Sequence, residues 1–289
     1  MKLIHDPHEI YAQIEHERRH SKRIGVVPTM GALHQGHLSL VERAKQECDL
    51  SVATIFVNPT QFGPNEDLSR YPRTLESDLV LLQKSNCDYV FVPTANQIYR
   101  DGHSTYVDPP AVAKQWEGVI RPVHFRGVAT IVLKLFQMIP AHVAYFGTKD
   151  YQQVAVLRGM VEDLNIPVRI EACPTIREAD GLAMSSRNRY LSSDERGRAL
   201  GLWRCLTAAQ KKLDEGCHAT SELEASMIEI LERAPVDSID YAAVVHPDSM
   251  ERIDRVEECA VAIVAARVGG TRLIDNLMLV APKQLGEDS

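Results

Sequence analysis

The stretch RIGVVPTMGALHQGHLSLVERAKQEC, residues 23–48, decides the fold because it joins a strand pattern to a helix pattern across a glycine-containing turn. Residues 23–29 form an apolar run rich in β-branched side chains, which predicts a buried strand. Residues 37–48 place apolar side chains at helical spacing, which predicts an amphipathic helix. Between the two lie His34 and His37. The stretch therefore predicts a strand–turn–helix unit with two imidazoles at its turn.

The same alternation of strand and helix patterns continues through the first 175 residues. Further strands are predicted at residues 50–58, 89–93, 142–147 and 168–175, and further helices at residues 75–86, 126–139 and 150–165. Apolar strands that alternate with helices are typical of a parallel sheet covered on both faces. The sequence therefore predicts an α/β fold with a Rossmann-like, doubly wound parallel sheet.

The pattern changes in the last third of the chain, where consecutive helices precede consecutive strands. Ser192 and Glu195 stand at capping-box spacing, which predicts the start of a helix. Ser221 and Glu224 repeat that signal for a second helix. Three strands are predicted at residues 239–245, 259–268 and 271–279. Short links between consecutive strands favour an antiparallel sheet.

This change divides the chain into two expected domains. The first, residues 1–175, carries the doubly wound sheet, and the second, residues 176–289, is a smaller C-terminal α+β domain. The chain contains no internal repeat and no low-complexity linker. We therefore expect the two domains to meet at a hinge within residues 175–187.

Composition and charge disfavour several classes of protein. Of the 289 residues, 45% are apolar and 25% are charged, the normal mixture for a globular protein with a buried core. The net charge of −7 lacks the basic excess that is typical of nucleic-acid-binding proteins. No apolar run reaches the roughly 18 to 20 residues that span a bilayer, and the first residues lack an apolar signal core. We therefore expect no nucleic-acid partner, no membrane association and a cytoplasmic location.

A metal site is one interpretation of His34 and His37. Two histidines three residues apart can face one ion, but zinc requires a third or fourth protein ligand. The chain has no HExxH motif, and its six cysteines are scattered without a CxxC pair. Scattered cysteines in a chain of this length are typical of free thiols in a reducing compartment. The sequence therefore predicts no protein ligand for a metal.

A phosphate site is the interpretation that the context of the histidines favours. In an open α/β sheet, ligands bind beyond the carboxyl ends of the strands. The N-terminus of the following helix offers backbone N–H groups and a partial positive charge, and Gly31 and Gly36 allow the backbone to approach a ligand. Imidazoles there can stabilise charge on a phosphoryl group. Neither a GxxxxGK[ST] motif nor a GxGxxG motif competes, and ordinary surface or core histidines remain the main alternative.

Longer motifs carry a family resemblance that covers essentially the whole chain. PTMGALHQGHLSLV, residues 28–41, resembles the signature of the pantothenate synthetase (pantoate–β-alanine ligase) family in the HxGH nucleotidyltransferase superfamily. Four further segments follow in the family's order: IFVNPTQFGPNEDLSRYPRT (55–74), HFRGVATIVLKLF (124–136), YFGTKDYQQ (145–153) and READGLAMSSRNRYLS (177–192). Two departures are visible. Ala141-His142 replaces a common Pro-Asp, and Thr148 replaces a common Glu.

The resemblance implies an AMP-forming acid–amino-acid ligase. The carboxylate of pantoate attacks the α-phosphate of ATP and gives pantoyl adenylate and pyrophosphate. The amine of β-alanine then attacks the acyl carbon and gives pantothenate and AMP. The resemblance also implies Mg²⁺ bound with ATP, a homodimer, a first domain that binds ATP and pantoate, and a second domain that closes as a lid to keep water from the adenylate.

The resemblance places the functional residues on a few segments. The implied ATP-binding residues are Met30, Gly31, Ala32, Leu33, His34, Gln35, Gly36, His37, Gly147, Thr148, Lys149, Asp150, Ile176, Met184, Ser185, Ser186 and Arg187. The implied catalytic residues among them are His37, His34 and Lys149, with His37 as the proton donor. Gln61 and Gln153 are the implied pantoate- and β-alanine-binding residues. Amide groups that donate and accept suit the hydroxyls and the carboxylate of pantoate.

Several of these residues also have a plainer interpretation. Met30 suits core filling, either glutamine suits a polar surface, and Asp150 suits a helix N-cap. Additional candidates outside the main set are Asn58 and Phe62 near pantoate, Arg121, His124 and Arg126 as phosphate or β-alanine contacts, and Asp78 and Asp88 as indirect contacts of Mg²⁺. Three rival functions stay open: an adenylyltransferase for another substrate, a nucleotide-sensing module without catalysis, and a metal hydrolase.

Overall fold

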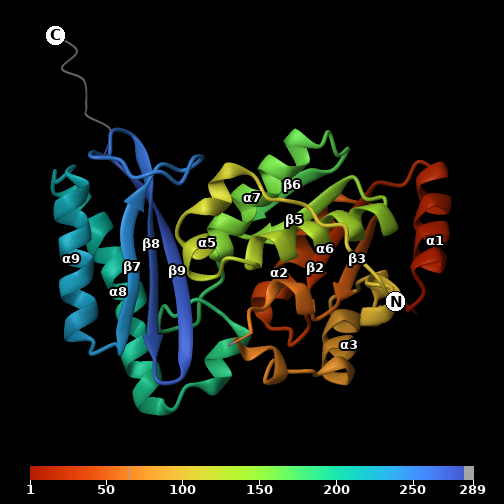
Figure 1. Ribbon diagram of the computed structural model, residues 1–289, viewed down its shortest axis with the longest axis horizontal. Coiled ribbons are helices and arrows are strands. Elements are labelled where there is room, and N and C mark those ends of the chain that lie inside the picture. Colours follow the sequence, from red (N-terminus) through yellow and green to blue (C-terminus); the bar gives the residue numbers. More distant parts are fainter. Residues whose placement is uncertain (65, 283–289) are drawn as a thin grey trace, which may run out of the picture. The chain divides into compact units, whose positions relative to one another are not determined.

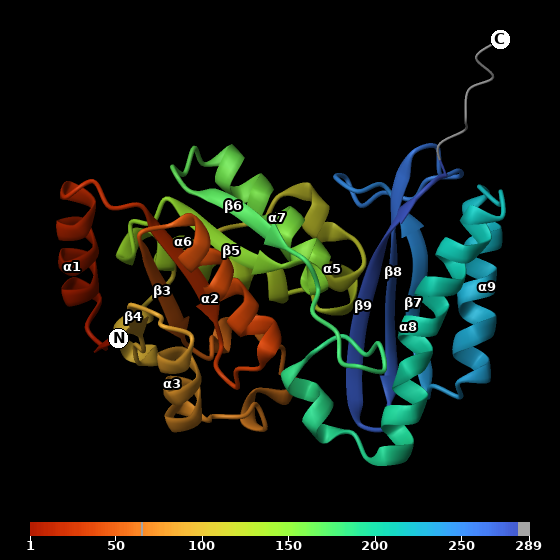
Figure 2. The same cartoon turned by 180° about the vertical axis from the view of Figure 1, so that it is seen from behind.

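The computed structural model describes residues 1–64 and 66–282 and shows two compact units (Figures 1 and 2). The first unit is Met1–Ile176, and the second begins at Arg177. Each unit has its own hydrophobic core.

The first unit is built on a six-stranded sheet in which every pair of neighbours is parallel. In spatial order the strands are β1 (Lys2–Ile4), β4 (Tyr89–Phe91), β3 (Leu50–Ile55), β2 (Ile24–Thr29), β5 (Val143–Gly147) and β6 (Arg169–Cys173). The chain winds from β2 through β3 to β4 in one direction and from β5 to β6 in the other. The direction of winding therefore reverses between the neighbours β2 and β5, which is where open α/β sheets bind ligands.

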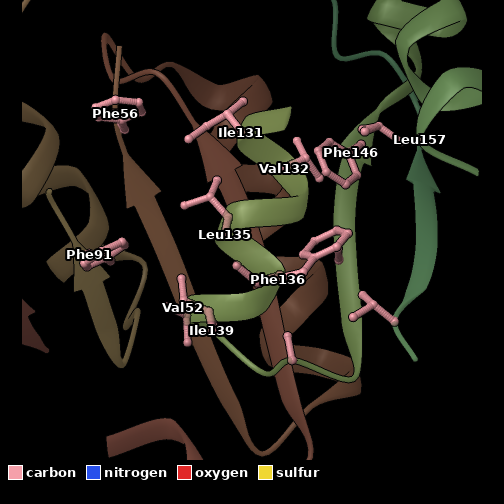
Figure 3. Close-up of a cluster of buried hydrophobic side chains, with 14 of the residues drawn as sticks. Val52, Phe56, Phe91, Ile131, Val132, Leu135, Phe136, Ile139, Phe146 and Leu157 are labelled. Atoms are coloured by element: carbon pink, nitrogen blue, oxygen red, sulfur yellow. The ribbon is translucent and has the colours of Figure 1, made fainter. Parts of the chain in front are cut away.

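Helices cover both faces of this sheet. The long helices are α1 (Pro7–Arg19), α2 (Gln35–Glu47), α3 (Leu75–Lys84), α6 (His124–Met138) and α7 (Tyr151–Asp163). Successive strand residues point to opposite faces, so Val26 joins the core under α1, α6 and α7, whereas Val27 joins the core under α2 and α3. Figure 3 shows α6 against the strands, with Leu135 and Ile139 in the core beside Val52.

Shorter helical segments line the loops of the first unit. They are the 3-10 helices η1 (Pro59–Gln61), η2 (Asp67–Ser69), η3 (Ala111–Lys114) and η4 (Thr148–Asp150), and the short helices α4 (Ala95–Ile98) and α5 (Glu117–Ile120). η1 follows β3, and η4 follows β5. Both therefore lie just after the carboxyl end of a strand, on the side of the sheet where a ligand is expected.

The second unit places two helices on one face of an antiparallel sheet. Its elements are the 3-10 helix η5 (Ser186–Tyr190), the helices α8 (Ser193–Asp214) and α9 (Thr220–Arg233), and the strands β7 (Ser238–Val245), β8 (Cys259–Val268) and β9 (Thr271–Val280). The sheet order is β7-β8-β9, with antiparallel pairs throughout. Ser192 caps α8 as predicted: its hydroxyl accepts the N–H of Glu195 at 3.3 Å, and Glu195 Oε2 accepts the N–H of Ser192 at 2.8 Å.

The predicted cap of the second helix is wrong. The N-cap residue of α9 is Ala219, not Ser221. Glu224 does not fold back onto the helix start, because its Oε1 accepts the N–H of Val244 and a hydrogen bond from Arg252, both at 2.8 Å. A tertiary contact with the next strand therefore takes the carboxylate that the capping box would have used.

Three further features bear on the sequence predictions. The edge strand β1 and the helix α1 were not predicted. Asp6 caps α1, and its carboxylate accepts the N–H groups of His8 and Glu9 at 2.9 Å. All six cysteines are free, which confirms the prediction. Among residues 1–64 and 66–282, no helix is long and apolar enough to cross a membrane.

Candidate active site

The turn after β2 carries the two histidines on a constrained backbone. β2 ends at Thr29, and Gly31 and Ala32 both have positive φ angles, 78° and 51°. The backbone angle of Gly31 favours glycine, and a Cβ atom there would also make tight contacts, at 3.1 Å from both Asp78 Oδ2 and Ile55 Cγ2. A left-handed alanine is strained, and such strain persists only where neighbouring groups hold the backbone.

Asp78 of α3 holds this turn in place. It is 1% exposed, and its two carboxylate oxygens accept the N–H groups of Ala32 and Leu33, both at 2.9 Å. Thr74 Oγ1 lies 3.2 Å from both oxygens. Burying a carboxylate without donors is costly, so the turn and Asp78 stabilise each other. We expected Asp78 only as an indirect contact of Mg²⁺. Its hydrogen bond to a residue 46 positions away could not be predicted from a local sequence pattern.

His34 and His37 cap the N-terminus of α2. His34 is the N-cap residue, and its Nδ1 accepts the N–H of Gly36 at 3.2 Å. His37 Nδ1 accepts the N–H of His34 at 3.3 Å, and the two ring centroids lie 4.1 Å apart. A ring nitrogen that accepts a backbone N–H carries no proton, so the proton of each ring sits on Nε2. The two caps therefore make Nε2–H the donor of both histidines.

The surroundings of His37 set its protonation state. Burial lowers the pKa of His37 from 6.5 to about 3, and the neighbouring His34 and Lys149 add to the shift. His37 is thus neutral near pH 7. A neutral imidazole can still stabilise developing negative charge through its Nε2–H group.

A second glycine-containing turn follows β5. Gly147 ends that strand, and residues 148–150 form a 3-10 turn before α7. β2 and β5 are neighbours, and Lys149 is close enough to lower the pKa of His37. No described heavy atom outside its chain neighbours lies within 4 Å of the place where a Cβ of Gly147 would be. The two turns therefore bring an ammonium group and two imidazoles to adjacent strand ends, a set of donors that suits phosphate oxygens.

The side chain of Asp150 does not make the expected cap. Asp150 is the N-cap residue of α7, but its carboxylate accepts no hydrogen bond from the first turn of that helix, all of which the structure describes. Its Oδ1 lies 3.8 Å from Lys149 Nζ. Thr148 Oγ1 lies 3.3 Å from Thr175 Oγ1, which links this turn to the segment that ends the first unit at Ile176. The acidic side chain thus balances the lysine rather than the helix end.

Gln61 lies beside the turn after β2. It is 7% exposed, and its Nε2 is 3.1 Å from Met30 Sδ. Its Oε1 accepts a hydrogen bond from Asn58 Nδ2 at 3.0 Å. A Cβ at Gly127 of α6 would lie 2.5 Å from Gln61 Cα, so only glycine lets this helix pack so closely on η1. The structure therefore brings Met30 and Gln61 together and fixes the amide from both sides.

Asn58 organises this loop. It is 1% exposed, its Nδ2 donates to Gly127 O at 3.2 Å, and its Oδ1 accepts from Tyr99 Oη at 2.7 Å. The neighbouring Phe62 is buried edge-to-face against Tyr71, with ring centroids 6.0 Å apart. Asn58 thus supports the backbone that carries Gln61, whereas Phe62 contributes apolar surface.

The two adjacent glutamines of α7 have different surroundings. Gln152 is buried and donates through Nε2 to Val112 O and Gln115 O, both at 2.8 Å, so it joins α7 to the preceding loop. Gln153 is half-buried in the first turn of α7, after Lys149. Among the described contacts, none joins Gln153 to Gln61. The structure therefore supports a structural role for Gln152 and places Gln153 on the helix that follows the second turn.

The additional charged candidates are paired with protein groups. Arg121 donates to Glu66 Oε2 through Nε and Nη2 at 3.0 and 2.5 Å, and Arg126 Nε lies 3.2 Å from Asp108 Oδ1. His124 is 7% exposed, and its Nδ1 donates to a backbone carbonyl of η1 at 3.1 Å. Burial lowers the pKa of His124 to about 4, and Arg121 adds to the shift.

Asp88, the other expected indirect contact of Mg²⁺, lies in a structural network. Lys45 Nζ lies 3.1 and 2.9 Å from its two carboxylate oxygens, and the N–H of Ser51 donates to Oδ2 at 2.8 Å. In residues 1–64 and 66–282, no three His, Cys, Asp or Glu side chains form a group that could hold a metal ion.

Comparison with known proteins adds the family. The sequence model described as pantoate–β-alanine ligase matches residues 2–278. The chain belongs to the pantoate–β-alanine ligase family. It is 53% identical over 265 residues to the pantothenate synthetase of Rhodopirellula baltica, which covers 91% of this chain and 93% of that protein. It is 48% identical over 279 residues to the pantothenate synthetase of Thermotoga petrophila, which covers 96% and 100%. The family expected from the motifs is thus confirmed.

Solved structures of the family have the same architecture. The crystal structure of pantothenate synthetase from Thermus thermophilus has a TM-score of 0.93 and 44% identity, covering 98% of this chain and 100% of that one. The pantoate–β-alanine ligase of Francisella tularensis, complexed with beta-gamma ATP and β-alanine, has a TM-score of 0.77 and 34% identity, covering 96% and 97%. These matches confirm the predicted fold, and membership makes this protein a ligase of pantothenate biosynthesis that joins pantoate to β-alanine.

In the second unit of the ligase, residues 184–187 lead into η5. Ser185 is the N-cap residue of η5, and its Oγ accepts the N–H of Arg187 at 3.3 Å. Ser186 is buried, whereas Met184, Ser185 and Arg187 are half-buried. This segment offers hydroxyl and guanidinium groups, the donors expected of a phosphate-binding segment.

Proposed function

We propose that this ligase uses ATP to join pantoate to β-alanine, and that it releases AMP and pyrophosphate through a pantoyl-adenylate intermediate. The observation that carries the proposal is that His34 and His37, which cap α2, lie near Lys149 at the adjacent ends of β2 and β5. The Nε2–H groups of the two imidazoles and the ammonium of Lys149 are hydrogen-bond donors that suit the stabilisation of phosphate charge. The proposed chemistry therefore starts at phosphorus.

In the first step, a carboxylate oxygen of pantoate bonds to the α-phosphorus of ATP while the bond to the bridging oxygen of the β-phosphate breaks. Pyrophosphate leaves with the electron pair of that bond. The Nε2–H groups of His34 and His37 and the ammonium of Lys149 donate to the phosphate oxygens as negative charge shifts toward the leaving group. The N-terminus of α2 adds its positive dipole end.

The same proposal assigns the remaining nucleotide contacts. Residues 30–37 and 147–150 contact the phosphates and ribose, the backbone of Ile176 contacts adenine, and residues 184–187 bind phosphate. Mg²⁺ would enter with ATP and would offset part of the negative charge of its phosphates. We assign no protein ligand to it, and Asp78 and Asp88 already accept hydrogen bonds from protein donors.

Pantoate recognition falls to Gln61 and Gln153 in this proposal. The carbonyl of the Gln61 amide faces Asn58, and its NH₂ group faces Met30 Sδ, a weak acceptor. A pantoate hydroxyl or carboxylate oxygen would be a stronger acceptor for that NH₂ group. The apolar atoms of Met30 and Phe62 suit the gem-dimethyl group of pantoate.

In the second step, the neutral amine of β-alanine attacks the acyl carbon of the adenylate. The bond between that carbon and the phosphate-linked oxygen breaks, and AMP leaves with this oxygen. The amine loses one proton to solvent as the amide forms. That ATP and β-alanine occupy the related Francisella protein together supports a site in which these two ligands fit at one time.

The decisive experiment is the exchange of labelled pyrophosphate into ATP, measured with Mg²⁺ and pantoate and without β-alanine. Pantoate-dependent exchange is expected, because the first step is reversible and needs only these ligands. Exchange that is absent with pantoate but present with another acid would give the protein a different substrate. Binding of ATP without exchange or AMP release under any condition would reduce it to a nucleotide-binding module.

We also propose, from family membership, that the protein acts in the cytoplasm as a homodimer. Sedimentation equilibrium of the purified protein should give twice the mass of 32.3 kDa. A mass of one chain over the working concentration range would contradict the homodimer. Recovery of the native protein outside the cytoplasmic fraction of its cell would contradict the location.

A further inference from the structure

A hairpin in the second unit leads directly into residues 184–187. Arg177 and Ala183 form an antiparallel bridge, and the N–H of Glu178 donates to Leu182 O at 2.8 Å. The conformation and position of this hairpin fix where the chain enters the segment that follows it. Whatever holds the hairpin therefore also sets the start of the proposed phosphate-binding segment.

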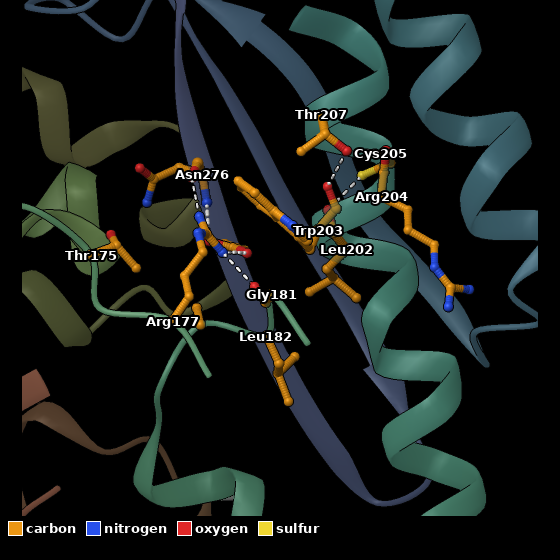
Figure 4. Close-up of polar contacts among 12 residues, drawn as sticks. Thr175, Arg177, Gly181, Leu182, Leu202, Trp203, Arg204, Cys205, Thr207 and Asn276 are labelled. Atoms are coloured by element: carbon orange, nitrogen blue, oxygen red, sulfur yellow. Dashed lines mark hydrogen bonds and ion pairs between the residues drawn. The ribbon is translucent and has the colours of Figure 1, made fainter. Parts of the chain in front are cut away.

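Arg177 is the centre of a clamp on the hairpin (Figure 4). Its Nη1 and Nη2 donate to Asp275 Oδ2 and Oδ1 at 2.6 and 3.0 Å. The same guanidinium donates to Gly181 O in the hairpin turn at 3.2 Å and to Asn276 O in β9 at 3.1 Å. Its central carbon lies 3.7 Å from the centre of the Trp203 ring on α8. One side chain thus joins the hairpin to β9 and α8.

The turn of the hairpin also fits closely against Trp203. Gly181 has a φ of 96°, and a Cβ there would lie 2.1 Å from Trp203 Cδ1. Only glycine therefore combines this backbone angle with this contact. The indole ring thus lies against both the guanidinium of Arg177 and the backbone of Gly181.

The residue that follows residues 184–187 is hydrogen-bonded to the same hairpin. Asn188 Nδ2 donates to Ala183 O at 3.0 Å and to Glu178 Oε1 at 2.9 Å. Arg196 Nη2 donates to Glu178 Oε2 at 2.8 Å. The segment is thus held at its entry and its exit by one frame, and the clamp on Arg177 fixes that frame.

Stability alone explains the clamp poorly. Asp275 is 4% exposed, and taking an ion pair out of water costs about as much as the pair regains, so an apolar replacement is often neutral. A bidentate contact between a guanidinium and a carboxylate, on the other hand, is strongly directional. The arrangement is therefore better suited to fixing a geometry than to adding free energy.

We propose that Arg177 and Asp275 are positioning residues for adenylation: they hold residues 184–187 in the conformation that binds the phosphates of ATP. The inference rests on the proposed function, in which this segment contacts phosphate. Neither residue contacts the reacting atoms in this proposal. Their effect reaches the ligand through the hairpin and the segment that follows it.

Two conservative variants test the clamp. Asp275→Asn keeps the shape of the side chain and removes its charge, and Arg177→Lys keeps the charge and removes the planar fork. In both, KM for ATP is expected to rise by about tenfold to a hundredfold, the scale for a misplaced binding group, while KM for pantoate changes less than about twofold. Trp203→Phe keeps an aromatic face beside Arg177 and should change KM for ATP less than Trp203→Leu does.

Matched controls come from a second Arg–Asp pair of the same unit. Arg198 Nη1 lies 2.7 Å from Asp237 Oδ1 and donates to Pro235 O at 3.1 Å. Arg198→Lys and Asp237→Asn should leave both KM values unchanged. Denaturant unfolding of every variant identifies those that fold, and Arg177→Lys decides the outcome if Asp275→Asn does not fold.

Three outcomes would overturn the proposal. In the first, folded clamp variants have an unchanged KM for ATP. In the second, KM for ATP and KM for pantoate rise equally. In the third, both KM values are unchanged and only the fraction of protein that is active falls. Arg187→Ala separates this failure from failure of the proposed function. If Arg187→Ala raises KM for ATP and the clamp variants do not, the clamp inference alone is wrong. If Arg187→Ala also leaves KM for ATP unchanged, residues 184–187 do not bind phosphate and the underlying assignment is wrong.

Discussion

The turn after β2 and residues 184–187 are both anchored by a buried aspartate, but the anchors work differently. Asp78 accepts backbone N–H groups of the turn itself, at Ala32 and Leu33. Asp275 acts through the side chain of Arg177 and holds the hairpin that precedes its segment. The direct anchor at Asp78 fixes the backbone angles of the residues whose N–H groups it accepts. The anchor at Asp275, which acts through the long side chain of Arg177, fixes the position of the whole hairpin.

This difference suits the proposed roles of the two segments. In the proposed function, the first turn places imidazoles at a reacting phosphorus atom, where misplacement by about 1 Å can cost a hundredfold in rate. In the same proposal, residues 184–187 bind phosphate without performing chemistry. Breaking the first anchor should therefore lower turnover, and breaking the second should chiefly weaken ATP binding.

The largest expected effect comes from the group that the first turn presents. His37→Ala should lower turnover by about 10² to 10³, the range for removing one preorganised donor to a developing charge. His37→Gln, whose amide N–H reaches about as far as Nε2, should recover part of that loss. Steady-state turnover of folded protein is the measurement, with the exposed His8→Ala as the control. Wild-type turnover in His37→Ala would remove the histidine from the mechanism.

The next effect comes from breaking the direct anchor. Asp78→Asn turns one acceptor into a donor that faces a backbone N–H, so turnover should fall by about a hundredfold. The free energy of unfolding should fall by about 1 to 3 kcal/mol for the buried donor left unpaired. Urea unfolding and turnover check both, with Asp163→Asn at the exposed end of α7 as the matched control. Unchanged turnover in folded Asp78→Asn would show that the anchor does not position the histidines.

A smaller, selective effect is expected at Gln61. Gln61→Ala should raise KM for pantoate by about tenfold, the equivalent of one lost hydrogen bond, and leave KM for ATP unchanged. This pattern is the reverse of the one expected for the clamp variants. The exposed Gln83→Ala serves as the control. Equal dependence on pantoate in wild type and Gln61→Ala would assign pantoate recognition elsewhere.

The smallest effect on turnover is expected from pH. Because the pKa of His37 is lowered from 6.5 to about 3, folded protein binds fewer protons than unfolded protein below about pH 6.5. The stability of the fold should therefore fall as the pH drops from about 6.5 towards 3, and His37→Gln should reduce that slope. Turnover should show no titration of His37 between pH 6 and 8. Urea unfolding at several pH values checks the slope, and a steeper slope in His37→Gln would contradict the lowered pKa.

Local patterns predicted the elements that local interactions build. The strand–turn–helix unit at residues 23–48 and the cap of α8 at Ser192 depend on periodicity and on contacts three residues apart. The cap at Ser221 failed because Glu224 contacts a strand 20 residues away. β1 was missed because only one of its 3 residues is buried, so it lacks an apolar run, whereas all 3 residues of the equally short β4, which was predicted, are buried.

The same distinction between local and long-range contacts applies to the candidate site. Chemistry alone favoured phosphate for His34 and His37, and the family motifs supplied Gln61 and Lys149 as candidates. Both aspartate anchors were missed, because Asp78 and Asp275 meet their partners across 46 and 98 residues of chain. Only the folded structure reveals such contacts, and no residue type or spacing in the sequence signals them.

The most direct test of the account follows one oxygen atom. Pantoate labelled with ¹⁸O in both carboxylate oxygens is converted with ATP and β-alanine, and the AMP is analysed by mass spectrometry. Attack of the carboxylate on the α-phosphorus predicts one ¹⁸O atom in each AMP, because that oxygen stays on phosphorus when the amine displaces AMP. AMP without ¹⁸O, formed together with pantothenate, would contradict the adenylate and with it the role proposed for the turn after β2.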